Sequence, residues 1–422
     1  MGRNQERTIT LTPNPATAAV DPSKITVKVI VNENFTAWNL ASAAATDATG
    51  LQWTITPEAI GSGYIKVYYD KVEFGSANIT IGQNFNQGIG WAWVTPYGGK
   101  IESIEALYGD ALQEMRSQTS LLYNDPVYGY FGQLESMEQM KGYKVNTKSA
   151  MSDGNYNKGT YPYEPSKPAY IQFNPKWNWF GTPYQFDRAV NDIMTFADFA
   201  EGDRIVSKNG GFAEYNGTEW EGSLTTLVAG EGYLLYYGNE ASSGGEFAAE
   251  AALGKPASQP SNAHALNKHA NVWHYDAAQF SDNMSMVADL GEEFADSRYS
   301  IGAYINGECR GEGVCVNGKW FITVHGDAAS NGQAVNFRVY DSMNGKIYDV
   351  DTTQPYSQMA GTLKAPISLK VAGSSTGIES ISADSLDPNA KYYTIDGIEV
   401  TNPTTGLYIV VDGNKAQKVY IK

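Results

Sequence analysis

The sequence has few of the side chains on which metal and cofactor chemistry depends. Its 422 residues include two cysteines and four histidines. The histidines show neither HExxH spacing nor a cysteine-histidine set of the kind that zinc sites use. The acidic runs lack the alternating Asp/Asn loop with a later Glu that defines a strong calcium motif. We therefore expect no metal site and no cofactor.

Signatures of catalysis are missing as well. The chain has no nucleophile elbow and no usable order of Ser, His and Asp. Its many carboxylates cannot be paired as acid and base from the sequence, because such pairs are defined by their distance in the fold. Gly230-Glu231-Gly232 has no following Lys-Ser/Thr and no dinucleotide-binding context, so it is interpreted as a turn. These observations favour a protein that is not an enzyme.

Charge and hydropathy argue against two further classes of partner. The chain has 30 Lys and Arg against 46 Asp and Glu, a formal net charge of −16. Nucleic acids and anionic lipid surfaces are polyanions, so an acidic chain without a long basic run is a poor partner for either. No apolar stretch reaches the roughly 18 residues of a membrane span, and we expect no transmembrane segment.

What the chain does contain is material for several small cores. Apolar residues make up 42 % and aromatic residues 12 %, with 28 tyrosines and 9 tryptophans. At roughly 100 to 150 residues per domain, the length predicts three to five units. The predicted fold class is mostly β and multidomain, with immunoglobulin-like sandwiches, two α+β repeat modules and a small C-terminal β module. The expected units are 1–83 (sandwich), 84–167 and 168–245 (repeats), 246–270 (linker), 271–372 (sandwich) and 373–422 (tail).

The first 83 residues consist of β-prone runs separated by turns. From Ile25 to Val31 every second residue is apolar, which is the period of a half-buried strand. The opening run Thr8 to Pro13 and the closing run Gly75 to Ile81 resemble the bacterial immunoglobulin-like repeats that space out surface proteins. We expect a small sandwich with strands at 8–12, 25–31, 51–56, 63–69 and 76–81.

An internal repeat follows this first segment. Trp91-Ala92-Trp93 is echoed 86 residues later by Trp177-Asn178-Trp179, and two glycines recur at an offset of 90 residues. Each copy passes from its Trp-x-Trp strand through an amphipathic segment to further strands, a β-α-β-β-β unit. The unit resembles a module found in tandem in Bacteroides surface proteins, a family that implies no particular activity. We expect two superposable modules.

The next region combines a linker with a second β-domain. Residues 241–270 are rich in Ala, Ser, Gly, Pro and Asn and are interpreted as a linker that holds one strand at most. Further on, Asn306-Gly307 and Asn317-Gly318 stand between β-prone runs and predict a three-stranded meander, and Asn344-Gly345 predicts another hairpin. The run Tyr299 to Gly311 resembles a recurrent sandwich of Bacteroidetes surface proteins.

Cys309 and Cys315 lie too far apart to pair if both belong to one extended strand. Six residues of strand separate their Cα atoms by roughly 20 Å, against a limit near 7 Å for a disulfide. A sharp bend between Arg310 and Gly313 would bring them together. We expect two free, mostly buried thiols, and the bent alternative stays open.

The tail from Thr376 to Lys422 carries the most specific pattern in the chain. Asp396-Gly397 and Asp412-Gly413-Asn414 each stand between β-prone runs, so two hairpins are predicted. The tail resembles the C-terminal sorting domain of secreted and surface-anchored Bacteroidetes proteins. A small terminal β-module is the alternative interpretation. The residues that carry the resemblance are Asp396, Gly397, Gly406, Tyr408 and Lys422.

The tryptophans are the best candidates for ligand binding. Residues i and i+2 of a strand share a face, so the two indoles of each Trp-x-Trp motif should lie side by side. Exposed, such a pair is a platform for sugars; buried, it is part of a core, and the size of the rings favours the core. Trp220, between two glutamates near a hairpin turn, is expected to be the most exposed tryptophan and a ligand-binding residue together with Tyr215.

These observations lead to an expectation for function. The sorting-domain resemblance implies a secreted or outer-surface location, with the export machinery as one partner. Met1 to Arg7 lacks the apolar core of a signal peptide, so we expect a larger precursor to supply it. We expect a non-catalytic binding or spacer protein whose partner is a surface glycan or another protein. The alternatives are a dedicated glycan-binding protein and the non-catalytic C-terminal half of a larger exported hydrolase.

Overall fold

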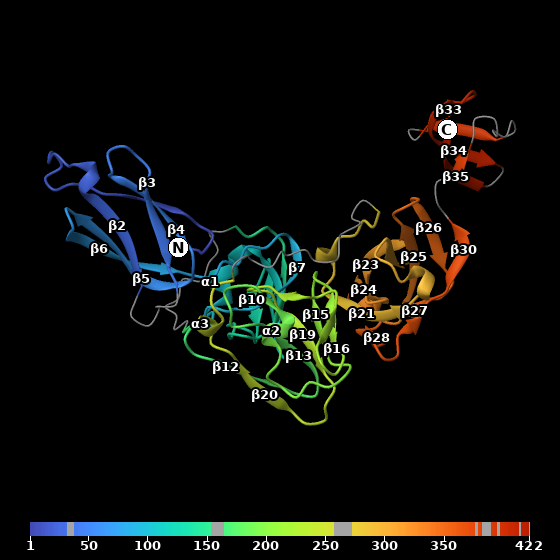
Figure 1. The fold of residues 1–422 in the computed structure, drawn as a ribbon, viewed down its shortest axis with the longest axis horizontal. Coiled ribbons are helices and arrows are strands. Elements are labelled where there is room, and N and C mark those ends of the chain that lie inside the picture. Colours follow the sequence, from blue (N-terminus) through green and yellow to red (C-terminus); the bar gives the residue numbers. More distant parts are fainter. Residues whose placement is uncertain are drawn as a thin grey trace. The chain divides into compact units, whose positions relative to one another are not determined.

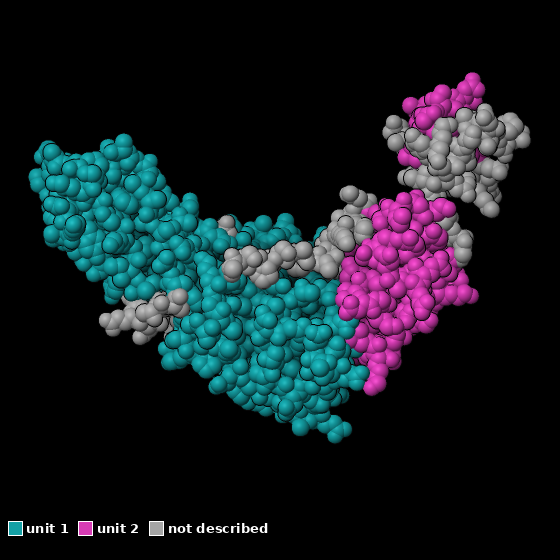
Figure 2. Space-filling view, viewed as in Figure 1, with its two compact units in different colours: residues 1–266, 276–283, 325–327 teal, residues 267–275, 284–324, 328–422 magenta. Residues whose placement is uncertain are grey.

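The computed structural model describes residues 1–31, 38–152, 164–256, 272–375, 379–381, 390–394, 397–412 and 415–421. Strands account for 49 % of the structure and helices for 8 %, so the fold is mostly β and built from several sheets, as expected (Figure 1). No helix of these residues is long and apolar enough to cross a membrane. Figure 2 colours two compact units: 1–266, 276–283 and 325–327 in teal, and 267–275, 284–324 and 328–422 in magenta.

The N-terminal part of the first unit is a β-sandwich, drawn in blue in Figure 1. Its elements are β1 (Arg7–Thr10), η1 (Pro22–Lys24), β2 (Ile25–Val31), β3 (Ala41–Ala45), β4 (Gln52–Pro57), β5 (Gly61–Tyr69) and β6 (Val72–Ile81). One sheet has the order β1-β4-β3 and the other β2-β5-β6. Val27, Ile55 and Ile79 are among the residues of the apolar core. The sequence pattern does not predict β3, because its alanines are poor strand formers.

Module 1, the first repeat, is a five-stranded antiparallel sheet with one short helix. Its elements are β7 (Gly90–Val94), α1 (Ile104–Tyr108), η2 (Gly109–Ala111), β8 (Leu112–Arg116), β9 (Leu121–Asp125), β10 (Gly129–Gly132) and β11 (Tyr143–Thr147). The strand order is β10-β9-β8-β11-β7. Ser103 begins α1 as an N-cap, since its hydroxyl accepts the N–H of Ala106 at 3.1 Å. Leu107 of α1 packs with Met115, Leu122 and Val145 in the module core.

Module 2, the second repeat, has the same architecture with two added pairs of strands. Its elements are β12 (Ala169–Phe173), β13 (Lys176–Phe180), β14 (Arg188–Ala189), α2 (Val190–Ile193), β15 (Arg204–Ser207), β16 (Phe212–Tyr215), β17 (Trp220–Gly222), β18 (Thr226–Leu227), β19 (Tyr233–Tyr237), β20 (Ser243–Phe247) and α3 (Glu250–Leu253). The main sheet has the order β17-β16-β15-β19-β13, while β14 pairs with β18 and β12 with β20.

The two strand orders confirm the internal repeat. Strands β7, β8, β9, β10 and β11 correspond to β13, β15, β16, β17 and β19, and the order across both sheets is then identical. A hydrogen bond recurs with the topology. The Tyr143 hydroxyl accepts the N–H of Glu138 at 2.7 Å, and the Tyr233 hydroxyl accepts that of Val228 at 2.6 Å. Both partners are shifted by 90 residues, the offset read from the sequence.

The modules contact each other through reciprocal backbone hydrogen bonds. Each Trp-x-Trp strand extends its edge with a short segment of the other module, which gives the pair an approximate two-fold relation. The bonds run from Gly142 N to Trp179 O (3.2 Å), from Gly232 N to Trp93 O (3.1 Å), from Gly181 N to Met140 O (2.9 Å) and from Thr95 N to Gly230 O (2.9 Å).

This contact explains why one of the repeated glycines, Gly142 in module 1 and Gly232 in module 2, is needed in both copies. A Cβ atom at Gly142 would lie 3.0 Å from the backbone N and O of Phe180, and one at Gly232 would lie 2.8 Å from the carbonyl oxygen of Val94. Both approaches are to backbone atoms, which cannot move aside as a flexible side chain could. The recurrence of Gly142 as Gly232 therefore reflects docking of the modules.

The segment expected to be a linker is partly structured. Phe247, in β20, is fully buried in the module 2 core, and Glu250, in α3, is 3 % exposed. The linker interpretation is thus wrong for residues 246–256, while 257–270 lie outside the described residues. Small residues dominate the segment, but the Phe247 ring and the Glu250 carboxyl group are sufficient to hold it against module 2. Residues 276–283 likewise belong to the first unit, although we expected them in the following domain.

The second unit contains one large sheet that curls around a single core. Its strands are β21 (Asp282–Asp289), β22 (Tyr299–Ile305), β23 (Glu308–Val316), β24 (Lys319–Gly326), β25 (Ala334–Asp341), β26 (Lys346–Val350), β27 (Gln354–Pro355), β28 (Met359–Ala360), β29 (Ile367–Ser368) and β30 (Val371–Ser375), with short helices η4 (Glu292–Phe294) and η5 (Ala328–Ser330). The short helix η3 (Ala277–Gln279) belongs to the first unit. The order is β28-β21-β24-β23-β22-β25-β26-β30, with β27 on β25 and β29 on β21. Trp320, Ile301 and Phe337 are buried inside it.

The hairpin turns of this sheet follow the sequence prediction. Asn306, Gly307, Asn317 and Gly318 all have positive φ, as a two-residue turn between β22, β23 and β24 requires. Gly345 has positive φ between β25 and β26. We expected residues 271–372 to form a sandwich of two sheets. Their strands instead form one curled sheet.

Cys309 and Cys315 both lie in β23 and are unpaired. The strand-based expectation of two free thiols is therefore confirmed, although both residues are half-buried and not deeply buried. Burial raises the pKa of both thiols, which keeps them in the less reactive protonated form at neutral pH.

The tail forms a small sheet with the order β31-β35-β34-β32-β33. Its strands are β31 (Glu379–Ile381), β32 (Lys391–Thr394), β33 (Glu399–Val400), β34 (Gly406–Asp412) and β35 (Lys415–Ile421). Both predicted hairpins are present, as β32 pairs with β33 and β34 with β35. Gly397 has a φ of 83°, Gly406 begins β34 and Tyr408 lies within it. Asp396 and Lys422 lie outside the described residues.

Candidate functional site

The paired tryptophans lie on the sheet face that points away from each module core. Val94 packs against the core of module 1 and Phe180 belongs to that of module 2, so the tryptophans one and three residues earlier face the other way. Trp93 is buried, and its Nε1 donates to the carbonyl of Ser281 at 2.9 Å. The Lys144 ammonium lies 4.9 Å from the Trp93 ring centre and 4.3 Å from that of Trp179. These indoles are packed, but outside the apolar cores.

The expectation of an exposed Trp220 is wrong. This tryptophan is 5 % exposed and belongs to the core of module 2. Its Nε1 donates to the carbonyl of Met194 at 2.9 Å, and its ring contacts Phe199 at 4.9 Å between centres. The indole points inward because β17 alternates, so the flanking glutamates take the outer face. Tyr215 is half-buried against Trp220 at 5.3 Å, and the two rings form no exposed platform.

A groove lies between the two modules. Its volume is about 740 Å³, within the size range of small-molecule sites. Module 1 contributes the loop 117–120 and the segment 133–143, while module 2 contributes β12 and the Trp-x-Trp strand β13. The reciprocal backbone hydrogen bonds connect the two walls, and the Gln118 side chain adds two further hydrogen bonds between them. Its Nε2 donates to Trp177 O at 2.8 Å and its Oε1 accepts from Trp179 N at 3.0 Å.

The groove carries amide, hydroxyl and aromatic side chains. Tyr170 is 60 % exposed, and Trp179, also in the lining, is half-buried. Further lining residues with polar side chains include Gln118, Thr119, Gln133, Ser136, Gln172 and Asn174, and the charged residues of the lining are Glu135, Glu138 and Lys141. The arrangement can donate and accept hydrogen bonds and can offer ring faces to a ligand.

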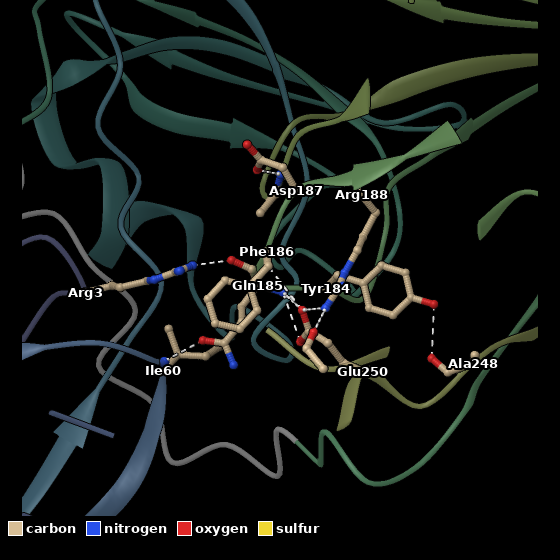
Figure 3. Close-up of polar contacts among 11 residues, drawn as sticks. Arg3, Ile60, Tyr184, Gln185, Phe186, Asp187, Arg188, Ala248 and Glu250 are labelled. Atoms are coloured by element: carbon tan, nitrogen blue, oxygen red, sulfur yellow. Dashed lines mark hydrogen bonds and ion pairs between the residues drawn. The ribbon is translucent and has the colours of Figure 1, made fainter. Parts of the chain in front are cut away.

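A buried carboxyl group organises the other side of module 2 (Figure 3). The Glu250 Oε1 accepts the N–H of Gln185 at 3.1 Å and that of Phe186 at 3.1 Å. The Arg188 guanidinium lies 3.5 Å away and donates more closely, at 2.7 Å, to the carbonyl of Gly254. The Gln185 side chain accepts the N–H of Ile60 at 2.9 Å. Glu250 thus holds a loop that also contacts the N-terminal sandwich.

Burial controls the ionisation of this group. It raises the pKa of Glu250 from 4.5 to about 8, while the backbone N–H groups of Gln185 and Phe186 act in the opposite direction. Burial likewise raises the pKa of Asp187, and it raises that of Glu231 to about 7 although the Tyr233 hydroxyl donates to its Oε2 at 3.3 Å. Raised carboxyl pKa values are common at functional sites.

The geometry around Glu250 is nevertheless that of a structural site. The adjoining cavity measures about 170 Å³ and includes Tyr184, whose hydroxyl donates to Ala248 O at 3.0 Å. The Glu164 carboxylate in its lining is paired with Lys167 at 2.7 Å. Since Glu250 is engaged by two backbone N–H groups, its oxygens are committed to holding the chain. Among the described residues, no group of three or more His, Cys, Asp or Glu side chains could hold a metal ion.

Sequence reasoning does not identify Glu250, Gln185 or Tyr170. A signal for the first was present, since a single glutamate stands between pairs of alanines in Ala248 to Ala252, where an isolated charge needs a partner. The groove has no local signal, because its two walls come from different modules and meet only through docking of the modules.

Comparison with known proteins adds no further assignment. No family model matches the chain, and neither a curated protein nor a solved structure matches it.

Proposed function

We propose that this chain is a secreted or cell-surface binding protein without catalytic activity, and that a neutral oligosaccharide is its ligand in the groove between the modules. The supporting observation is the composition of that groove, whose lining includes amides, hydroxyls and the rings of Tyr170 and Trp179. Sugar hydroxyls need paired donors and acceptors, which amides supply, and the C–H faces of sugar rings stack on aromatic rings.

The rigid walls of the groove support the same proposal. Reciprocal backbone bonds and the Gln118 contact fix the positions of the two modules, so a ligand would not have to order the site on binding. The sorting-domain resemblance of the tail supports an exported location. A spacer protein does not need a preformed groove, whereas a glycan-binding protein does need one.

The proposal is tested by screening the purified chain on a glycan array and measuring affinity by calorimetry. Tyr170→Ala and Gln172→Ala should each weaken the best array ligand about 10-fold, because a ring contact or a hydrogen-bonded amide contributes roughly 1 to 1.5 kcal/mol. Phe74→Ala is the matched control, since Phe74 is 72 % exposed in the N-terminal sandwich.

Two results would contradict the proposal. Absence of binding to every arrayed glycan would leave the spacer alternative. Hydrolysis of a bound glycan, abolished by Glu135→Gln or Glu138→Gln in the groove lining, would show an enzyme.

A further inference from the structure

Module 1 presents an aromatic row across the outer face of its sheet. The strand registers place Phe131 opposite Tyr123, Tyr123 opposite Glu114, Glu114 opposite Asn146, and Asn146 opposite Trp91. Their neighbours along the strands, Leu122, Met115 and Val145, belong to the module core, so all five side chains of the row are on the outer face. With about 4.8 Å between strands, the row from β10 to β7 spans about 19 Å.

The row is open to solvent at its Phe131 end, while Tyr123, Asn146 and Trp91 are partly exposed and Glu114 is 9 % exposed. Phe131 is 51 % exposed, and its ring stacks on that of Tyr123 at 5.5 Å with 25° between the planes. The Arg116 guanidinium lies 4.8 Å from the ring centre of Trp91. Leu121, beside the row, is 41 % exposed. Phe131 and Leu121 are thus exposed apolar side chains outside the core of module 1.

Together with Arg116 beside it, the row has no net charge. Arg116 forms an ion pair with Glu114, and Asn146 is a neutral amide that is partly exposed. The whole chain carries a formal charge of −16, so uronic or sulfated polymers would be repelled over longer distances. A neutral partner with hydroxyl groups and apolar C–H faces fits both the rings and the amide.

The corresponding row of module 2 is different in kind. By the same registers it consists of Glu221, Glu214, Arg204, Tyr236 and Trp177. Arg204 and Glu214 are 0 % and 1 % exposed, with the guanidinium Nε donating at 3.2 Å. The open aromatic surface is thus not a by-product of the repeat fold, because the sister module carries a buried ion pair at the same place.

We infer that the outer face of module 1 binds the flat surface of an ordered, neutral polysaccharide. This inference rests on the proposed function in that the chain binds glycans, but it concerns a separate surface. A sheet face touches a ligand from one side only, so a single soluble chain would gain few contacts there. An ordered polysaccharide presents many parallel sugar rings at once and can cover Trp91, Tyr123 and Phe131 together.

The test is depletion of the purified full chain by microcrystalline cellulose, chitin or insoluble β-1,3-glucan. We expect retention on at least one of them, and at least 10-fold weaker retention for the double variant Tyr123→Ala/Phe131→Ala. Phe74→Ala and the groove variant Tyr170→Ala should be retained like the parent chain. Phe131→Gln, a single change at a partly exposed ring on the edge strand β10, covers the case in which the double variant does not fold.

Three results would overturn the inference. The chain could fail to bind all three polysaccharides, or the Phe131 variants could bind as well as the parent. A fall in sedimentation coefficient for these variants would instead make the face an interface between copies of the chain. Loss of array binding with retained depletion would reject the groove and keep this face, so the two proposals can fail separately.

Discussion

The two modules share one topology and differ in what their outer faces carry. Module 1 has exposed rings on that face, whereas module 2 has the buried pair Arg204 and Glu214. Their cores and their reciprocal glycine contacts are alike. The comparison teaches that the repeat is preserved where each module packs on itself and on its sister, and that on the outer face it is preserved at the tryptophans but diverges on the other strands.

The loops after the two Trp-x-Trp strands show a second divergence. In module 1 the loop donates the N–H of Tyr97, at 2.8 Å, to the neutral amide of Gln83. In module 2 the corresponding loop donates two N–H groups to the carboxyl group of Glu250. The backbone N–H groups of the loop thus donate to a neutral amide in module 1 and to a titratable carboxyl group in module 2. At this loop, only the stability of module 2 should depend on pH.

The largest expected effect separates the two outer faces. Glu214→Ala should cost module 2 about 3 to 5 kcal/mol of unfolding free energy, because it leaves the Arg204 guanidinium buried without its carboxylate. The equivalent change on the open face, Glu114→Ala, should cost at most about 1 kcal/mol, since its partner Arg116 is 38 % exposed. Urea unfolding of both variants checks this, and equal losses would mean that the faces are alike.

The next effect concerns pH. Below pH 4.5 Glu250 is protonated in the folded and unfolded chain alike. Between pH 4.5 and about 8 the folded state alone keeps the proton, so stability should fall as pH rises, by up to about 1.4 kcal/mol per pH unit. Glu250→Gln should remove this fall while keeping an oxygen acceptor for the loop.

The converse variant sharpens the test of the loops. Gln83→Glu places a carboxyl group at the 3 % exposed amide position of module 1 and should introduce a similar fall there. Urea midpoints measured from pH 4 to 9 decide the matter. A Glu250→Gln chain whose midpoints still fall with pH would assign the effect to another group, such as Glu231.

How far the sequence predicts this molecule depends on the range of the interactions involved. The Asn-Gly and Asp-Gly hairpins are local, and they are where the strand patterns place them. The repeat is visible because two copies share spacing. The side on which Trp220 packs and the groove itself depend on contacts between distant segments, which no local pattern encodes. The anchor Glu250 was hidden in a segment whose composition is that of a linker.

A smaller effect tests the contact that both modules share. Gly142→Ala and Gly232→Ala should each cost about 1 to 3 kcal/mol, because the added methyl group meets backbone atoms of the other module at 2.8 to 3.0 Å. Gly88→Ala is the control, since a Cβ there meets nothing within 4 Å. If only one of the two glycines were sensitive, the reciprocal relation of the modules would not hold in solution.

The smallest expected effect is that of Phe131→Ala on stability. The ring is already 51 % exposed and lies on an edge strand, so its removal forfeits chiefly the stacking on Tyr123, worth about 0.5 to 1.5 kcal/mol. Glu221→Ala, at the equivalent position of module 2, is the matched surface change and should stay within about 0.5 kcal/mol. Thermal unfolding monitored by circular dichroism checks both. A loss above 3 kcal/mol for Phe131→Ala would mean that the ring holds module 1 together, and the open face would then be part of its architecture and not a surface kept for a ligand.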